Sequence, residues 1–212
     1  MKNDVSVKRA VIFTGGFCSF SHLSSDDFNG DLIIAADAGR ITAEMCGVHP
    51  GIIVGDFDSS PIPAHTTAEI IRVPAEKDDT DTMLACRIAI ERGATELYVI
   101  GGTGGRLDHT LSNVFFLEAL HERGVRTVLT DGVNRLHLLK DETVALSSSR
   151  FTYFSLFALD SAHVTLEGCK YPLDNALLSR DNPYALSNEI TADKATISVS
   201  GGAVLLVESD AR

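Results

Sequence analysis

The stretch "GIIVGDFDSS" at residues 51–60 joins a short apolar run to an acidic turn that contains Asp56 and Asp58. An apolar run that ends in aspartate also occurs in "DLIIAAD" at residues 31–37. Short β-rich runs that alternate with longer segments of helical periodicity are typical of βαβ units around a parallel sheet. The sequence therefore predicts an α/β domain with a mostly parallel sheet, which we assign to residues 1–137.

Four more strands of this domain are predicted from their β-rich composition, at residues 9–14, 69–74, 96–101 and 126–131. Two segments between the strands, 80–93 and 110–124, have apolar residues at helical spacing and end in glycine. Such a pattern predicts helices that end at or just before the glycine.

The last part of the chain has a different character. Short segments rich in threonine, valine and tyrosine follow one another without helical periodicity, which predicts a smaller all-β sandwich domain at residues 138–212, with a small barrel as the alternative. Its strands are expected at residues 142–147, 150–159, 162–168, 188–193, 194–200 and 203–209. A segment of this size is marginally stable alone, so we expect it to dock on the first domain or on a second chain.

Composition and charge exclude several classes of protein. Hydrophobic residues make up 44% of the 212 residues and charged residues 22%, so the chain is globular and not disordered. The net charge of -11 repels a nucleic-acid backbone, and we predict no nucleic-acid partner. We find neither a signal peptide nor a membrane segment, so we predict no membrane association and a cytoplasmic location. The cysteines lack the spacing of a zinc site or a disulfide framework and are expected to be small buried hydrophobes: Cys18, Cys46, Cys86 and Cys169.

The aspartates gather at predicted element ends. Asp37, Asp56 and Asp58 follow strands, and Asp78 and Asp81 lie in a turn that opens a helix. Carboxyl ends of parallel strands form one edge, and carboxylates about 5 Å apart there repel by roughly 3 kcal/mol at an effective dielectric near 20. Mg²⁺, which binds a few carboxylates together with substrate phosphates, would relieve this repulsion. Ordinary turns and a favourable charge at a helix N-terminus are the alternative explanation.

The glycine-rich segment "VIGGTGGRLDH" at residues 99–109 follows a strand and precedes a helix. Backbone N–H groups in such a loop bind anions, and Arg106 is suited to grip two phosphate oxygens. "FTGG" at residues 13–16 is a weaker copy of the same pattern. The segment matches neither a Walker A loop nor GxGxxG, so a tight glycine turn remains the alternative.

Seven motifs in this order resemble the thiamin pyrophosphokinase family. Four lie in the first domain: "ADAG" (36–39), "GDFDS" (55–59), "KDDTD" (77–81) and "GGTGGRLDH" (101–109). Three resemble the thiamin-binding domain of that family: "FSLFAL" (154–159), "TLEGCKYPLDN" (165–175) and "LSNE" (186–189). The resemblance covers nearly the whole chain.

The resemblance implies transfer of the pyrophosphoryl group of ATP to the hydroxyl of thiamin, which gives thiamin diphosphate and AMP. It also implies a homodimer with active sites at the subunit interface. By motif position, the Mg²⁺ ligands are Asp56, Asp58 and Asp81. The nucleotide and the reaction centre are assigned Asp37, Lys77, Asp78, Thr103, Gly104, Gly105, Arg106, Asp108 and His109. The thiamin contacts are assigned to Tyr171, Ser187 and Asn188.

Three questions stay open at this point. The general base is either Asp81 or Asp108, with Asp108 slightly preferred because a carboxylate that holds Mg²⁺ is a poorer base, and Mg²⁺ and Arg106 are the expected charge-neutralising groups. Ala38 stands where the family often has glycine, which predicts a differently shaped turn, because alanine adopts a positive φ only at a cost. A metal-dependent phosphohydrolase and a non-catalytic sensor of thiamin or nucleotide are the competing functions.

Overall fold

The computed structural model describes residues 9–20, 22–57, 66–74, 79–147 and 151–210. The chain divides into two compact units, residues 1–132 and 133–212. The predicted boundary at 137/138 falls inside β7 (Asn134–Lys140), which pairs along its whole length with β13 (Ala203–Ser209). This pairing places all of β7 in the second unit.

The first unit contains a parallel sheet with the strand order β4-β3-β2-β1-β5-β6. Its strands are β1 (Arg9–Phe13), β2 (Leu32–Ala36), β3 (Ile52–Gly55), β4 (Glu69–Arg72), β5 (Glu96–Ile100) and β6 (Arg126–Thr130). Each lies within a predicted range, because these apolar runs are short and are bounded by turn residues. The prediction of a parallel α/β domain is confirmed.

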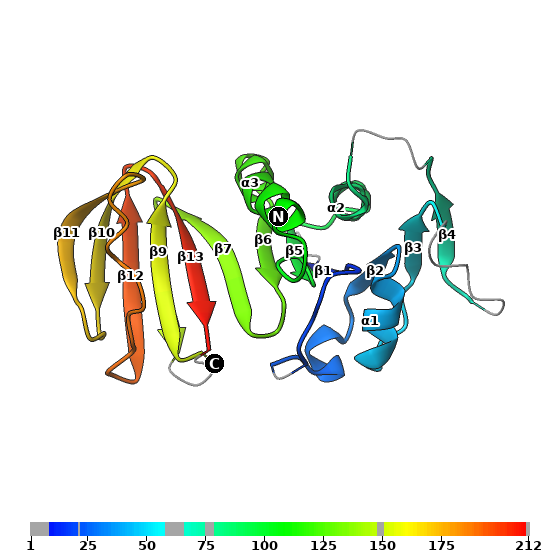
Figure 1. Ribbon diagram of the computed structural model, residues 1–212, viewed down its shortest axis with the longest axis horizontal. Coiled ribbons are helices and arrows are strands. Elements are labelled where there is room, and N and C mark those ends of the chain that lie inside the picture. Colours follow the sequence, from blue (N-terminus) through cyan, green and yellow to red (C-terminus); the bar gives the residue numbers. More distant parts are fainter. Residues whose placement is uncertain (1–8, 21, 58–65, 75–78, 148–150, 211–212) are drawn as a thin grey trace, which may run out of the picture. The chain divides into compact units, whose positions relative to one another are not determined.

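Helices cover both faces of this sheet (Figure 1): η1 (Ser25–Phe28), α1 (Gly39–Met45), α2 (Asp81–Glu91) and α3 (Leu107–Glu122). Phe13 of β1 packs with Phe28 of η1 and Ala43 of α1 in a buried cluster on one face. Neighbouring residues of β1 point to the opposite face, toward the side where Figure 1 shows α2 and α3. The helices α2 and α3 were predicted, whereas η1 and α1 were not.

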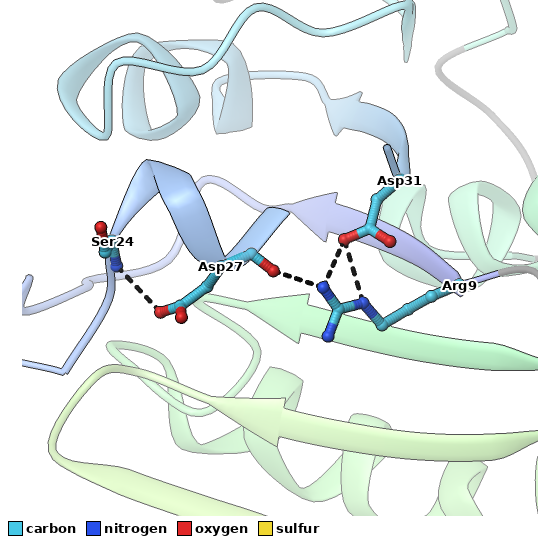
Figure 2. Close-up of polar contacts among 4 residues, drawn as sticks. All are labelled: Arg9, Ser24, Asp27 and Asp31. Atoms are coloured by element: carbon cyan, nitrogen blue, oxygen red, sulfur yellow. Dashed lines mark hydrogen bonds and ion pairs between the residues drawn. The ribbon is translucent and has the colours of Figure 1, made fainter. Parts of the chain in front are cut away.

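The amino ends of β1 and β2 are tied together by polar contacts (Figure 2). The guanidinium of Arg9 donates to Asp31 Oδ2 through Nε at 2.9 Å and through Nη2 at 2.6 Å, and also to the carbonyl oxygen of Asp27. The backbone N–H of Ser24 donates to the Asp27 carboxylate at 3.2 Å. These bonds fix the end of the sheet opposite to the carboxyl ends of its strands.

The second unit is a β-sandwich, as predicted. One sheet has the order β7-β13-β9, with β9 at Tyr153–Ala158, and the other has the order β11-β10-β12-β8. The strands of the second sheet are β8 (Thr143–Ser147), β10 (Ser161–Glu167), β11 (Leu173–Ser179) and β12 (Lys194–Ser200). Apolar residues from both sheets, Leu156 and Leu206 from one and Val164 and Ile197 from the other, form one buried core.

Two expectations for this unit were wrong. Residues 188–193 form no strand, because only isolated bridges from Asn188 to Phe154 and from Ile190 to Cys169 occur there. The strand β11 was missed, because its exposed residues hide the alternating pattern.

All four cysteines are free, as expected, but Cys18 and Cys46 are only half-buried.

Candidate active site

A cavity of about 430 Å³ lies in the first unit at the carboxyl ends of β1, β2 and β5. Its walls come from five segments of the chain: residues 14–17, Ala36 with Asp37, residues 80–82, the glycines of the loop 101–105, and four residues that lie in the first turns of α3 or immediately before it. The four are Arg106, His109, Thr110 and Asn113. Parallel sheets bind their ligands at this edge, so the cavity is the candidate site.

Asp37 follows β2 in a left-handed conformation with a φ of 46°. Its backbone N–H donates to the Val54 carbonyl of β3 at 2.8 Å, which fixes the turn against the neighbouring strand. Ala38 has a φ of -63°, so the positive φ falls on the aspartate and not on the alanine. Aspartate tolerates this conformation better than most residues, and Ala38 therefore fits the turn without strain.

Two glycine loops meet backbone to backbone beside the cavity. A Cβ on Gly16 would lie 2.1 Å from the carbonyl oxygen of Gly101, and a Cβ on Gly104 would lie 2.3 Å from that of Phe17. The N–H of Thr14 also donates to the Ile100 carbonyl at 2.9 Å. Glycine is thus required at both loops by close approach, and "FTGG" is an integral part of the site.

Asp81 is the first residue of α2 and lines the cavity. The hydroxyl of Thr80 accepts a hydrogen bond from the N–H of Met83 at 3.2 Å and caps the helix. The preceding Asp79 pairs with Arg87 of α2, with 2.9 Å between Arg87 Nε and Asp79 Oδ2. The cap and the ion pair together hold the start of α2, and so Asp81, at the cavity wall.

Arg106 immediately precedes α3 and pairs with Asp108 through two hydrogen bonds. Nε lies 3.1 Å from Oδ1, and Nη2 lies 2.5 Å from Oδ2. Both side chains are largely exposed, and the guanidinium lowers the pKa of Asp108 to about 2. Arg106 and His109 line the cavity, whereas Asp108 and Thr103 are not among its lining residues.

Sequence reasoning missed two polar residues of α3. Asn113 is buried and donates from Nδ2 to the Gly102 carbonyl at 2.8 Å, and the hydroxyl of Thr110 lies 3.1 Å from the Thr103 carbonyl oxygen. Both residues line the cavity. Their sequence signal is the presence of polar residues three apart on one face of an apolar helix.

The predicted thiamin contacts lie in the second unit. The side chain of Asn188 is 3% exposed and brackets the backbone of Tyr171, because Oδ1 accepts from its N–H at 3.0 Å and Nδ2 donates to its carbonyl at 2.9 Å. Tyr171 itself is 57% exposed. Ser187 has a φ of 51°, and its N–H donates to the hydroxyl of Ser155 at 3.0 Å.

Comparison with known proteins identifies the family. Residues 28–129 match "Thiamin pyrophosphokinase, catalytic domain", and residues 136–204 match "Thiamin pyrophosphokinase, vitamin B1 binding domain". A thiamine pyrophosphokinase from Bacillus subtilis (strain 168) is 31% identical over 196 residues, which are 84% of this chain and 87% of the relative. The chain belongs to the thiamin pyrophosphokinase family.

Solved structures of the family have the same fold. The thiamine pyrophosphokinase structure from Bacillus subtilis superimposes with a TM-score of 0.84 at 26% identity and covers 97% of this chain and 100% of its own. The structure from Geobacillus thermodenitrificans gives a TM-score of 0.81 at 29% identity and covers 96% of this chain and 98% of its own. The α/β domain followed by a β-sandwich is therefore the architecture of this family.

Three residues assigned by the family resemblance, Asp58, Lys77 and Asp78, lie outside the described residues. Among the residues that the structure describes, no three His, Cys, Asp or Glu side chains are gathered as a metal site. Asp37 and Asp81 nevertheless bring carboxylates to the cavity wall, and Asp56 follows the adjacent strand β3. Hard oxygen donors of this kind fit Mg²⁺ better than a softer transition metal.

No helix of the described ranges is both long and apolar enough to cross a membrane.

Proposed function

We propose that this member of the family transfers the pyrophosphoryl group of ATP to the hydroxyl of thiamin, which yields thiamin diphosphate and AMP. One observation carries the proposal: two interlocked glycine loops, the acidic start of α2 and Arg106 surround one cavity at the carboxyl edge of a parallel sheet. Glycine loops before a helix provide N–H donors for phosphate, and the arginine adds positive charge.

The reaction needs positioning more than covalent catalysis. The hydroxyl oxygen of thiamin attacks the β-phosphorus of ATP in line, and the bond between that phosphorus and the bridging oxygen of AMP breaks. The glycine loop 101–105 and Arg106 would hold the phosphates, while Asp37 and His109 would contact other parts of the nucleotide. Lys77, Asp78 and Thr103 complete the proposed nucleotide site.

We propose that Asp56, Asp58 and Asp81 bind Mg²⁺. When bound, the ion supplies positive charge that neutralises the phosphate oxygens as the transition state forms. Without it, the carboxylates would repel both one another and the polyphosphate. Isothermal titration of the protein with Mg²⁺ in the presence of ADP tests this assignment independently of turnover.

Of the two candidates for the general base, Asp81 is favoured. The ion pair with Arg106 lowers the pKa of Asp108 to about 2, which makes that carboxylate a weak proton acceptor. Asp81 also lines the cavity, whereas Asp108 does not. The proton of the thiamin hydroxyl would therefore pass to the carboxylate oxygen of Asp81 that does not hold Mg²⁺.

For thiamin, we propose contacts with Tyr171, Ser187 and Asn188 of the second unit. Tyr171 offers an exposed ring that suits the cationic thiazolium, because aromatic faces attract cations. Because Asn188 brackets the backbone of Tyr171, we propose that it acts mainly by fixing the chain that carries this ring. A homodimer with active sites at the subunit interface and a cytoplasmic location are the remaining parts of the proposal, and sedimentation of the full chain tests the dimer.

The test is incubation of the full chain with ATP, Mg²⁺ and thiamin, followed by chromatography of the products. Equal amounts of AMP and thiamin diphosphate are expected. Release of phosphate without thiamin would instead support a phosphohydrolase, and binding without turnover would support a sensor.

In the same assay, the substitution Asp58→Asn should lower turnover by roughly 10²-fold or more if this carboxylate binds the metal, and a near wild-type rate would refute that role.

A further inference from the structure

Two side chains on one face of α3 fix two successive carbonyl groups of the glycine loop. Nδ2 of Asn113 lies 2.8 Å from the carbonyl oxygen of Gly102, and Oγ1 of Thr110 lies 3.1 Å from that of Thr103. Thr110 Oγ1 is also 3.2 Å from the Arg106 carbonyl oxygen, which already accepts the backbone N–H of Thr110. The hydroxyl of Thr110 therefore donates to the carbonyl oxygen of Thr103.

These bonds determine where the N–H groups of the loop point. In a trans peptide the C=O and the N–H point in opposite directions. When the carbonyls of Gly102 and Thr103 are held toward α3, the N–H groups of Thr103 and Gly104 point away from it. Successive N–H groups with a common orientation form a concavity that binds anions.

The segment 14–17 holds a second side of the loop. A Cβ on Gly104 would lie 2.3 Å from the Phe17 carbonyl oxygen, so the backbone there is already at contact distance from the 14–17 segment. Asn113 is 8% exposed, which leaves its amide few alternative partners in water. The loop is thus held both by α3 and by the first glycine loop, and its donors are preorganised.

We propose that Asn113 and Thr110 are positioning residues that aim the N–H groups of the glycine loop at the polyphosphate of the nucleotide. The inference rests on the proposed function, because that function supplies the nucleotide. The two side chains act through the backbone of Gly102 and Thr103 and do not contact the reacting atoms. Preorganised donors cost no reorganisation when charge develops, so their loss weakens phosphate binding and slows the reaction together.

The test compares isosteric variants by calorimetric titration with α,β-methylene-ATP, whose bridge between the first two phosphates cannot be broken by pyrophosphoryl transfer. Asn113→Asp removes the donor and places a carboxylate oxygen against the Gly102 carbonyl. Thr110→Val removes the hydroxyl at nearly constant volume, and Thr110→Ser retains it. Each loss of a donor should weaken binding of the analogue roughly tenfold, whereas Thr110→Ser should bind as the wild type does.

Titration with AMP separates positioning from a general loss of structure. Because AMP has a single phosphate, its Kd should change much less than that of the analogue. Thr127→Val is the matched control, because the Thr127 hydroxyl is buried in β6 with no hydrogen-bond partner among the described residues and lies outside the cavity wall. This control should bind both ligands normally.

Three results would overturn the inference: wild-type affinity for the analogue in both donor-loss variants, equal weakening for AMP and the analogue, or equal weakening in Thr110→Ser. If Asn113→Asp does not fold, the comparison of Thr110→Val with Thr110→Ser decides the question. A wild-type protein that binds the analogue but forms no thiamin diphosphate would overturn the proposed function and not this inference.

Discussion

The backbone of Gly16 lies against the carbonyl group of Gly101, so closely that a Cβ on Gly16 would stand 2.1 Å from the carbonyl oxygen. The same Cβ would be 2.9 Å from the Gly104 carbonyl oxygen. A backbone oxygen cannot rotate aside as a flexible side chain can, so the two loops must separate if a side chain is added at residue 16.

Gly16→Ala is therefore expected to lower the free energy of unfolding by about 1–3 kcal/mol, the usual cost of overpacking. It should also weaken nucleotide binding, because the glycine loop 101–105 shifts. Gly51→Ala is the control, because a Cβ there would meet only the Ile33 carbonyl oxygen at 3.8 Å. Urea unfolding and calorimetric titration measure the two effects, and equal behaviour of both variants would contradict the interlock.

Asp81→Asn is expected to lower kcat by roughly 10²- to 10⁴-fold, because the amide neither accepts the hydroxyl proton nor carries charge for a metal. The two side chains have the same shape, so the melting temperature should stay close to that of the wild type. Asp26→Asn, at an exposed position of η1, should keep full activity. Steady-state kinetics with thiamin diphosphate as the measured product checks both, and a rate within tenfold of the wild type would exclude Asp81 as the base.

Arg106→Gln is expected to raise the pKa of Asp108 from about 2 toward the ordinary value near 3.9, because the guanidinium is the first cause of the shift. The folded-state pKa is the lower one, so the ion pair stabilises the fold above about pH 4 and this contribution is lost as the pH falls toward 2. The contribution is small at an exposed site. Carboxyl ¹³C titration by NMR follows the pKa directly, and an unchanged value would contradict the ion pair.

Tyr171→Ala and Asn188→Ala should separate binding from structure in the second unit. Loss of the exposed tyrosine ring should raise the KM for thiamin roughly tenfold, as expected for a lost cation contact, with little effect on the melting temperature. Loss of the buried amide removes the two bonds from Asn188 to the Tyr171 backbone and should lower the free energy of unfolding by about 1–3 kcal/mol. Identical effects of both substitutions would argue against the bracket.

Arg135→Met is expected to lower the free energy of unfolding by about 2–3 kcal/mol, because it leaves the Glu208 carboxylate buried without its cation. Arg135 Nη2 lies 2.5 Å from Glu208 Oε2 across β7 and β13, and Glu208 is 4% exposed. The double substitution with Glu208→Leu should recover most of the loss. Denaturant unfolding checks this, and a single substitution as stable as the wild type would contradict the burial argument.

Much of the fold was predictable from local patterns. The strands β2 and β3 end immediately before Asp37 and Asp56 as expected, because buried parallel strands are continuous apolar runs with sharp ends. Helix α1 escaped prediction because it is short and exposes Ile41 and Met45, which blurs its apolar face. The strand predicted at residues 188–193 does not form, because strand pairing depends on partners far along the chain.

The sequence by itself determined the strands of the first unit and the helices α2 and α3, that glycine loops and aspartates follow the strands, and which family the motifs resemble. Only the tertiary structure decided that residues 14–17 lie against residues 101–105 and that Thr110 and Asn113 hold the second loop. The reason is the strand order, in which β1 pairs with β2 on one side and β5 on the other. Local periodicity specifies a strand but not its neighbours, and the site forms only where those neighbours end together.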